Sequence, residues 1–297
     1  MPELVKKIQP IIAAVLMLAK FLFALVNTGE LPVRDIYEKE ENAIRVMSFN
    51  VLCGGAGEHS MENRKELVAQ TIAEIFPDSL GVQEATPAWM LWLSSRLPEY
   101  DYVGVGRDNG KNKGEFSAVF YLKEKYRVLD SGTFWISETP EVPSRGWDSA
   151  CNRVCTWAVL ENKNTGEQYA HINTHLDHVS VTAREKGIEM ILAKAESFNI
   201  PVVCTGDFNL YEDSALYEKL TAGVLKDTKF LAPQTMNTAT FSSFNPNPNP
   251  RNIIDYVLVN GGMKPLVYRV VNEGIGGVTV SDHYPVYSDM VFETNSH

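Results

Sequence analysis

The stretch VVCTGDFN, residues 202–209, decides how the rest of the chain is interpreted. Its apolar start is typical of a buried strand, and Gly206 separates that run from two polar residues. Asp207 and Asn209 are two positions apart, so an extended backbone places their side chains on one side. The stretch predicts a strand that ends with a carboxylate and an amide at a sheet edge, although an Asx-type turn would suit the same residues.

Five other apolar runs carry polar residues at one end. The segments are SFN at 48–50, QE at 83–84, NTHLDH at 173–178, IDYVLV at 254–259 and SDHYPV at 281–286. Their candidate site residues are Asn50, Glu84, His175, Asp255, Asp282 and His283. Each alone could be a surface acid, a half-buried loop histidine or part of a turn. Together with the opening stretch they predict a polar site where the ends of several strands meet.

Hydrophobic periodicity predicts an α/β chain. Strands are expected at residues 44–50, 78–83, 100–106, 116–122, 126–136, 153–161, 168–175, 201–207, 253–259, 265–271 and 285–292, and helices at 63–76, 86–97, 181–198 and 213–220. Strands dominate and hairpins occur, so mixed sheets are expected rather than a doubly wound parallel sheet. No GxGxxG or Walker loop precedes a helix, and a nucleotide-cofactor fold is therefore not expected.

Composition narrows the class of partner. The chain has 297 residues, of which 44% are hydrophobic, enough for one large core or two small ones. It has 27 basic and 37 acidic residues and a net charge of −10. An acidic protein lacks the electrostatic footprint of a tight duplex binder, so duplex DNA is not an expected substrate. A phosphate ester can still bind if metal ions offset the local carboxylates.

The four cysteines predict neither a zinc site nor a required disulfide. Cys204 lies in an apolar run and is interpreted as a small core residue. Cys151 and Cys155 are four positions apart, but no pair of His or Cys partners completes a zinc pattern. A disulfide between these two residues is left open as a minor alternative.

Residues 8–26 form an apolar run that Gln9, Pro10 and Lys20 interrupt. As a helix this run would be about 28 Å long, close to the hydrocarbon core of a bilayer at about 30 Å. Two lysines precede it, so a signal anchor would leave the N-terminus cytoplasmic and the main domain outside. A cleaved signal peptide and a packed or interfacial helix are the alternatives.

The domain organisation follows from this run. Residues 1–26 are the hydrophobic segment, residues 27–42 form a polar linker, and residues 43–297 form the globular domain. We expect a membrane-anchored, extracytoplasmic domain that contacts the membrane through residues 8–26, with a secreted or a cytoplasmic protein as alternatives. The cysteines argue mildly against an oxidising compartment. We expect the protein to be a monomer.

In the order SFN, QE, NTHLDH, GDFN, IDYVLV and SDHYPV, the strand-end motifs resemble the endonuclease/exonuclease/phosphatase superfamily, also called DNase I-like. The resemblance covers residues 44–292, and the set is specific although GDFN or SDH alone would be less so. It implies a four-layer α/β sandwich, in which two mixed β-sheets pack face to face with helices outside. It also implies a site at one end of the two sheets.

The resemblance implies roles for the candidate residues. Glu84 matches the principal Mg²⁺ ligand, with Asn50 and Asp282 beside the metal. Asp207 and Asn209 match the pair that activates the attacking water and binds the phosphate. The remaining matches are His175 at a phosphate-contacting position, His283 as the essential imidazole and Asp255 as the acid that orients it.

The chemistry of phosphate esters agrees with this set. Mg²⁺, or Mn²⁺ in its place, neutralises the phosphate oxygens, a carboxylate accepts the proton of the water, and an imidazolium stabilises developing charge. We expect a phosphodiesterase that acts on a small phosphodiester, a single-stranded nucleic acid or a phospholipid headgroup. The alternatives are a phosphomonoesterase for a sugar, inositol or nucleotide phosphate, and a binding module that has the fold without activity.

Further segments resemble a bacterial subgroup of the superfamily, similar to its carbon-catabolite-repressor-type branch. They are RDNG at 107–110, GEF at 114–116, GTFWISETP at 132–140 and GWD at 146–148. Arg107 and Arg153 are candidates for a phosphate clamp, because guanidinium binds phosphate bidentately. Trp147 is a candidate for stacking on a base or a sugar. Surface arginines and a packed tryptophan are the ordinary alternatives.

Overall fold

The computed structural model describes residues 36–275 and 278–293. The chain divides into two compact units. The larger unit comprises Ile36–Asn272 and Val280–His297, and the smaller one Met1–Asp35 and Glu273–Thr279. In the described part of the smaller unit, Ile275 and Val278 form an isolated antiparallel bridge. Both β-sheets and the helices around them belong to the larger unit.

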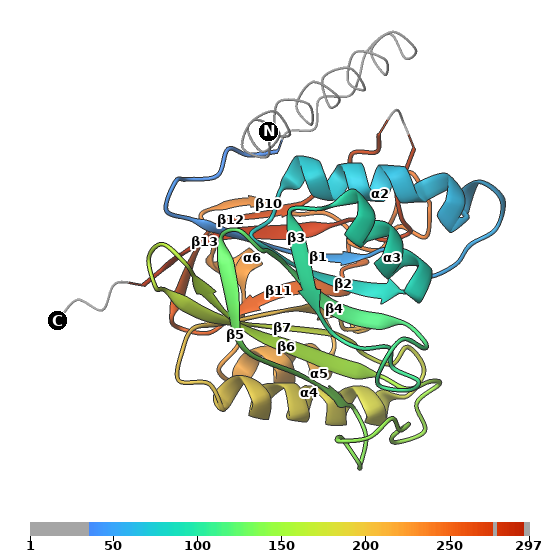
Figure 1. Ribbon diagram of the computed structural model, residues 1–297. Coiled ribbons are helices and arrows are strands. Elements are labelled where there is room, and N and C mark those ends of the chain that lie inside the picture. The colour runs from blue at the N-terminus through green and yellow to red at the C-terminus, as the bar shows by residue number, and fades with distance from the viewer. Residues whose placement is uncertain (1–35, 276–277, 294–297) are drawn as a thin grey trace, which may run out of the picture. The chain divides into compact units, whose positions relative to one another are not determined.

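Two mixed sheets form the centre of the larger unit (Figure 1). The first sheet has the strand order β10 (Gln234–Met236), β12 (Met263–Val270), β13 (Val286–Phe292), β1 (Ile44–Asn50), β2 (Ser79–Ala85), β4 (Phe116–Leu122) and β3 (Tyr100–Val103). The second has the order β5 (Tyr126–Trp135), β6 (Val154–Asn162), β7 (Gln168–His175), β8 (Val202–Asp207), β11 (Asp255–Val259) and β9 (Lys226–Asp227). Most pairs are antiparallel, but β1 runs parallel to β2, β7 parallel to β8 and β10 parallel to β12.

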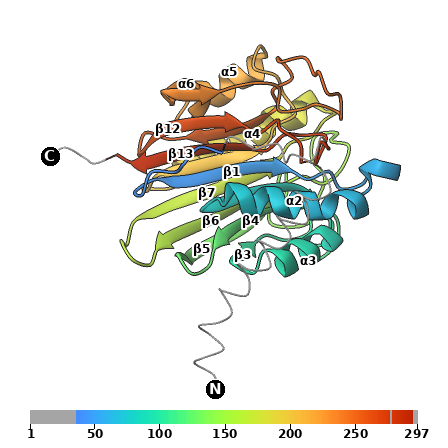
Figure 2. The ribbon, with the colours of Figure 1, turned by 90° about the horizontal axis from the view of Figure 1, so that it is seen from above.

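Helices cover the outer face of each sheet. Figure 1 shows α2 (Met61–Ile75) and α3 (Pro87–Arg96) outside the first sheet, and α4 (Val181–Glu196) and α5 (Ala215–Ala222) outside the second. Figure 2 views the same layers from the side of α2 and α3. The predicted four-layer α/β sandwich is confirmed. The helical starts follow from local capping, since the side chain of Thr86 accepts a hydrogen bond from the backbone of Trp89 and Pro87 follows at the first helical position.

Several predicted boundaries were wrong by a few residues. β3 ends at Val103 rather than at residue 106, and α5 begins at Ala215 because the Ser214 side chain caps it. Four short elements were not predicted: the 3₁₀ helix η1 (Gly57–His59), β9, α6 (Thr228–Leu231) and β10. Each has four residues or fewer, too short for a periodic pattern to develop.

The N-terminal predictions lie mostly outside the described residues. This holds for the apolar segment at 8–26 and for residues 27–35 of the linker. Within residues 36–275 and 278–293, no helix has the length and apolar content needed to cross a bilayer. Residues 36–42, predicted as linker, belong to the larger unit. There the backbone N–H of Tyr37 donates to the Tyr287 hydroxyl at 3.2 Å, and Lys39 pairs with Asp78 at 2.5 Å.

Strand register brings the polar strand ends together. In the second sheet, Asp207 at the end of β8 lies opposite His175 on β7 and Asp255 on β11. In the first sheet, Asn50 at the end of β1 lies opposite Gln83 on β2. A β-bulge between Val82 and Ala85 interrupts the pairing of β2 with β4 beside Gln83 and Glu84. The site is therefore built on strand ends from both sheets.

A buried polar layer joins the two sheets. His171 bonds Ser79 Oγ at 2.8 Å through Nδ1 and Thr205 Oγ1 at 2.9 Å through Nε2. Gln83 Nε2 donates to Asn173 Oδ1 at 2.7 Å. Burial lowers the pKa of His171 to about 3, so its imidazole is neutral. These bonds satisfy polar groups that would otherwise be costly to bury.

Gly81 makes this close approach of the sheets possible. A Cβ atom at this position would lie 2.1 Å from Thr205 Oγ1 and 2.4 Å from Asn173 Oδ1. Any larger residue would push the polar side chains of the second sheet away from β2. We infer that the glycine is required by the spacing between the sheets and not by backbone conformation.

Asp78, the residue directly before β2, is a buried acid with several hydrogen-bond donors around it. Its fully buried carboxylate accepts hydrogen bonds from Lys39, from Lys125 and from the backbone of Arg45. Burial alone would raise the pKa of Asp78, but the two lysines lower it below its ordinary value. A carboxylate with a depressed pKa contributes stability that is lost as the pH falls through that pKa.

We expect Asp78→Asn to lower the free energy of unfolding by about 3 kcal/mol at pH 7, because two lysines lose their buried partner. The wild type begins to lose the same contribution below a pH of about 4 and loses all of it only below the lowered pKa of Asp78, so the difference should shrink as the pH falls through this range. Urea unfolding at both pH values measures the difference. A gap that stays constant down to pH 3 would contradict this account.

Candidate active site

A cavity of about 890 Å³ opens where the strand ends meet. Most of the predicted site residues line it, namely Glu84, His175, Asp207, Asn209, Asp282, His283, Arg107 and Arg153. Asn50 and Asp255 are buried directly behind it, at 0% and 1% exposure. Residues from α4, from α5 and from the loop after β8 form the outer wall, including Val181, Arg184, Tyr211 and Leu216.

Asp207 lies at the base of the cavity. Its Oδ2 accepts a hydrogen bond from Asn50 Nδ2 at 3.0 Å, and its Oδ1 accepts one from the backbone N–H of Asn209 at 3.0 Å. His175 Nε2 lies 3.4 Å from the same Oδ2. Burial raises the pKa of Asp207. A carboxylate with a raised pKa is a better proton acceptor than an ordinary surface aspartate.

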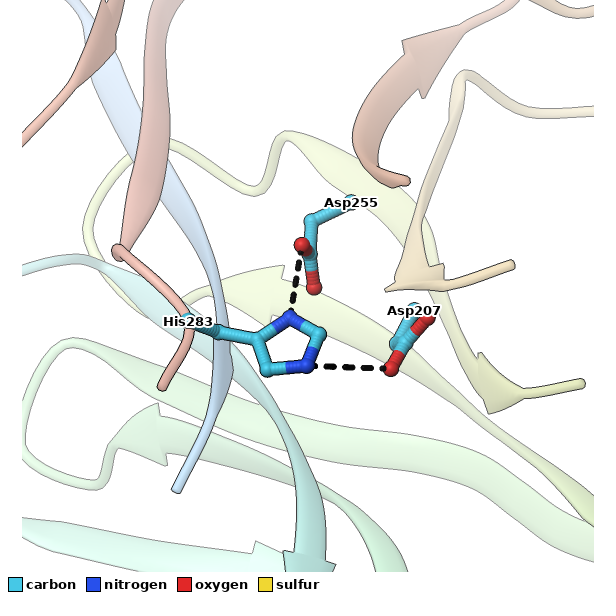
Figure 3. A group of neighbouring side chains, drawn as sticks. All are labelled: Asp207, Asp255 and His283. Atoms are coloured by element: carbon cyan, nitrogen blue, oxygen red, sulfur yellow. Dashed lines mark hydrogen bonds and ion pairs between the residues drawn. The ribbon is translucent and has the colours of Figure 1, made fainter. Parts of the chain in front are cut away.

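His283 is held between two aspartates (Figure 3). Its Nδ1 donates to Asp255 Oδ2 at 2.9 Å, and its Nε2 lies 3.7 Å from Asp207 Oδ2. Burial lowers the pKa of His283, but the charges of Asp255 and Asp207 outweigh burial and raise the pKa above its ordinary value. Thr240 Oγ1 accepts from the backbone N–H groups of Ile254 and Asp255, which fixes the start of β11. The result is an imidazolium whose Nε2 is turned toward the carboxylate of Asp207.

Glu84 and Asn50 form the side of the site that belongs to the first sheet. Asn50 Nδ2 donates to Glu84 Oε1 at 3.1 Å, and Asn50 Oδ1 accepts from the backbone of Leu52 at 3.0 Å. The backbone N–H of Cys53 donates to Glu84 Oε2 at 2.9 Å. Burial alone would raise the pKa of Glu84, but these donors lower it, so the carboxylate is ionised. Asn50 therefore orients Glu84 and Asp207 through its NH₂ group. The resemblance implied that Asn50 lies beside the metal, and this stays a prediction.

Two carboxylates on this side fit a divalent cation. Glu84 and Asp282 both line the cavity, and burial and the charge of Glu84 both raise the pKa of Asp282. Acids that repel each other in a polar cavity are the hard oxygen donors that Mg²⁺ prefers. A second group, Asp207, Asp255 and His283, also has ligand atoms within 4.8 Å of one another. Its imidazole already donates to Asp255, so we assign that group to proton handling.

Glu84 has an unusual backbone conformation. Its φ is +59°, in the left-handed region that a residue with a long side chain rarely adopts. Asn209 has a φ of +50°, which asparagine tolerates better. Glu84 lies near the end of β2, at the bulge between Val82 and Ala85, and Asn209 follows the end of β8 by two residues. Both line the cavity. Non-glycine residues in this conformation occur preferentially at functional sites.

His175 and Asn209 complete the base of the cavity. Burial and the charge of Arg153 lower the pKa of His175, so this imidazole is neutral. Its Nδ1 is buried and has no hydrogen-bond partner among the described residues. Asn209 Nδ2 donates to the backbone oxygen of Leu176 at 3.0 Å, which fixes the amide beside Asp207.

Of the three residues predicted to bind substrate, two line the cavity. The guanidinium of Arg107 donates to both oxygens of Glu115, at 2.6 and 2.9 Å. Arg153 is 4% exposed and its Nη2 bonds His178 Nδ1 at 2.9 Å. Trp147 does not line the cavity and instead packs against the apolar cluster beneath α4. The predicted loop position gave no information on which way this side chain points.

Of the predictions for the cysteines, one is confirmed and one is wrong. Cys204 is a fully buried core residue, as expected. All four cysteines are free thiols, so the minor alternative of a Cys151–Cys155 disulfide was wrong. Cys155 packs in the apolar core, whereas Cys151 lines the cavity together with Cys53. A spacing of four along the chain does not reveal that the two thiols face different surroundings.

Arg64 on α2 was missed by the sequence interpretation. It is 1% exposed and donates to the backbone oxygens of His59, Val51, Val280, Leu52 and Gly54, at 2.7 to 3.2 Å. These carbonyls belong to the loops that flank Glu84 and Asp282. Arg64 thus ties together the backbone around both proposed metal ligands. Arginine on a helix is ordinarily exposed. The one available signal for its burial was the position of Arg64 on the same helix face as apolar residues.

Comparison with known proteins agrees with the fold described above. Residues 47–283 match the model of the Endonuclease/Exonuclease/phosphatase family. The family protein of Bacteroides vulgatus is 35% identical, with a TM-score of 0.81 over 85% of this chain and 100% of that one. The mannosyl-6-phosphatase of Bacteroides thetaiotaomicron is 32% identical, with a TM-score of 0.79 over 84% and 100%. The CCR4-Not complex 3'-5'-exoribonuclease subunit Ccr4 of Emericella nidulans is 24% identical over 49% of this chain and 27% of that one.

Proposed function

The chain belongs to the Endonuclease/Exonuclease/phosphatase family, whose members hydrolyse phosphate esters, and from that premise we propose that it cleaves a phosphodiester by direct attack of water. The arrangement of Asp207, His283 and Asp255 carries this proposal. It supplies a proton acceptor and a cationic donor side by side, and in-line attack of water on an anionic phosphate ester requires both. No Ser or Cys nucleophile paired with a base is needed for such a reaction.

In the proposed reaction Asp207 accepts a proton from the attacking water. Asn50 and the backbone N–H of Asn209 hold its two oxygens in place. The imidazolium of His283 donates through Nε2 to a phosphate oxygen as negative charge builds up, and Asp255 stabilises the cation and fixes the orientation of its ring. His175 and Asn209 line the phosphate pocket as neutral groups.

Glu84 and Asp282 would hold Mg²⁺, or Mn²⁺ in its place, which supplies charge neutralisation at the phosphate and at the leaving oxygen. Asn50 and the backbone of Cys53 keep Glu84 ionised and oriented for this purpose. Arg64 fixes the loops on which both carboxylates depend.

A second candidate is a phosphomonoesterase for a sugar, inositol or nucleotide phosphate. The specific support is the mannosyl-6-phosphatase of Bacteroides thetaiotaomicron, which is similar over its full length. Arginines in the cavity wall also suit the second charge of a monoester. The same residues would act on either ester, because the attacked phosphorus and the developing charges are alike.

A substrate panel tests both candidates. The purified protein with Mg²⁺ or Mn²⁺ is offered bis-p-nitrophenyl phosphate, hexose 6-phosphates, inositol phosphates, single-stranded RNA and sphingomyelin. We expect metal-dependent hydrolysis that EDTA stops and that His283→Ala removes. If no ester is cleaved faster by the wild type than by His283→Ala, the chain is a binding module with this fold and the proposal is wrong.

Glu84→Gln tests the metal site separately. An amide is a weaker and uncharged ligand, so we expect half-maximal activity to need about tenfold more Mg²⁺, within the range seen when metal-site residues are altered. The measurement is a Mg²⁺ titration of initial rates. Glu74→Gln on the outer side of α2 is the matched control, because Glu74 does not line the cavity. An unchanged Mg²⁺ requirement in Glu84→Gln would assign the metal to other residues.

A further inference from the structure

One wall of the cavity carries three arginines, Arg107, Arg153 and Arg184. Each has a buried guanidinium N–H group without a hydrogen-bond partner among the described residues, at Nε of Arg107, Nη1 of Arg153 and Nε of Arg184. Unsatisfied buried donors are rare in native proteins, because a buried N–H group without an acceptor has lost its hydrogen bonds to water. Three of them in one cavity wall indicate that a bound group supplies the acceptors.

The rest of each guanidinium is fixed by the protein. Arg153 Nε points to Asp177 Oδ2 at 3.4 Å, and Asp177 in turn accepts at its backbone oxygen from Arg184 Nη1 at 2.6 Å. Glu115 holds Arg107 through two hydrogen bonds. The protein thus positions the three cations before a ligand binds.

The wall lies beside the phosphate pocket and extends beyond it. Arg107 and Arg153 line the same cavity as His175, and their charges, together with burial, lower the pKa of that imidazole. The opposite side of His175 faces Asp207 Oδ2 at 3.4 Å. A phosphodiester has two non-bridging oxygens, and the proposed cation and His283 already bind at that position. The wall therefore offers three further donors besides the groups that would bind the attacked phosphate.

We propose that Arg107, Arg153 and Arg184 form a subsite for a second anionic group of the substrate, a phosphate, sulfate or carboxylate carried by the same molecule. This inference rests on the proposed function, since it places the attacked phosphate over Asp207 and His283. Guanidinium groups bind such anions with short, directional hydrogen bonds. A substrate without a second anion leaves the buried donors unpaired and is discriminated against for that reason.

The test is a binding comparison in EDTA, where the metal-dependent reaction does not interfere. Isothermal titration measures glucose 6-phosphate, glucose 1,6-bisphosphate and 6-phosphogluconate against the full-length protein. We expect the ligands with a second anion to bind tenfold or more tightly than glucose 6-phosphate. The bisphosphate and the phosphogluconate arms distinguish a second phosphate from a carboxylate.

Two variants locate the preference. Arg153→Met should reduce the ratio between the bisphosphate and the monophosphate affinities to within threefold. Arg145→Met is the matched control, because Arg145 is exposed in the preceding loop and does not line the cavity, and it should leave the ratio unchanged. If thermal unfolding shows that Arg153→Met is not folded, Arg184→Met takes its place.

A wild-type ratio within threefold, or an equal ratio in Arg153→Met and Arg145→Met, would overturn the inference. Initial rates with Mg²⁺ on glucose 6-phosphate and bis-p-nitrophenyl phosphate are measured in parallel. A protein that binds the bisphosphate preferentially but cleaves neither ester refutes the proposed function and leaves the anion subsite in place. A protein that cleaves both esters without any preference refutes the subsite alone.

Discussion

His283→Ala is expected to lower kcat by about 10³-fold, because it removes the cation that stabilises charge on the phosphate. His283 Nε2 lies 3.7 Å from Asp207 Oδ2, and Asp255 keeps the ring in one orientation. The KM should change much less, since the interaction strengthens mainly in the transition state. Initial rates on the best ester of the substrate panel measure both constants.

Asp255→Asn separates two roles of Asp255, the orientation of the imidazole and the stabilisation of its positive charge. It retains the shape of the side chain but weakens the support for the imidazolium, so we expect about a 10²-fold loss of kcat. His59→Ala is the control, because His59 stacks on Phe244 at 3.7 Å and does not line the cavity. Activity within a factor of a few of wild type in His283→Ala would remove His283 from the reaction.

Asp207→Asn is expected to lower kcat by about 10³-fold through loss of the proton acceptor. Its effect on stability should have the opposite sign. Burial raises the pKa of Asp207, which means that the folded protein disfavours the charged form at neutral pH. Removing the charge should therefore leave the unfolding temperature at pH 7 unchanged or higher.

The combination of a large loss of rate with no loss of stability is diagnostic. Rates and thermal unfolding are measured on the same preparation, with Asp213→Asn as the control because Asp213 is exposed in the loop that follows. A folded Asp207→Asn protein that keeps the wild-type rate would exclude Asp207 as the base. A strongly destabilised variant would show that the carboxylate holds the strand ends together instead.

Strand ends were the part of the site that sequence could predict. An apolar run that stops at an acid or an amide identifies both the strand and the rigid position of its last side chain, as with Asp207 and Asn50. Their meeting point follows from register, and register follows from the resemblance to a known fold rather than from periodicity. The position of Asp207 opposite both His175 and Asp255 is the clearest example.

Residues outside regular strands were harder to predict. Trp147 lies in a loop without periodicity, and it packs inward although the sequence suggested a stacking platform. Arg64 is buried although its residue type predicts exposure, because carbonyls of the loop after β1 and of Val280 satisfy its guanidinium. His171 between the sheets carries no local signal at all. These contacts form only in the folded chain, so sequence patterns did not reveal the roles.

The left-handed backbone of Glu84 has a consequence for engineering. At φ +59° a glutamate is strained by roughly 1–3 kcal/mol, and glycine or asparagine would adopt the same backbone more easily. Neither residue reproduces the carboxylate that lines the cavity. A directed-evolution screen that selects heat resistance alone would therefore tend to replace this residue and produce a sturdier but inactive protein. Under the proposed role of Glu84 in metal binding, the residue that gives activity lowers thermal stability at this position.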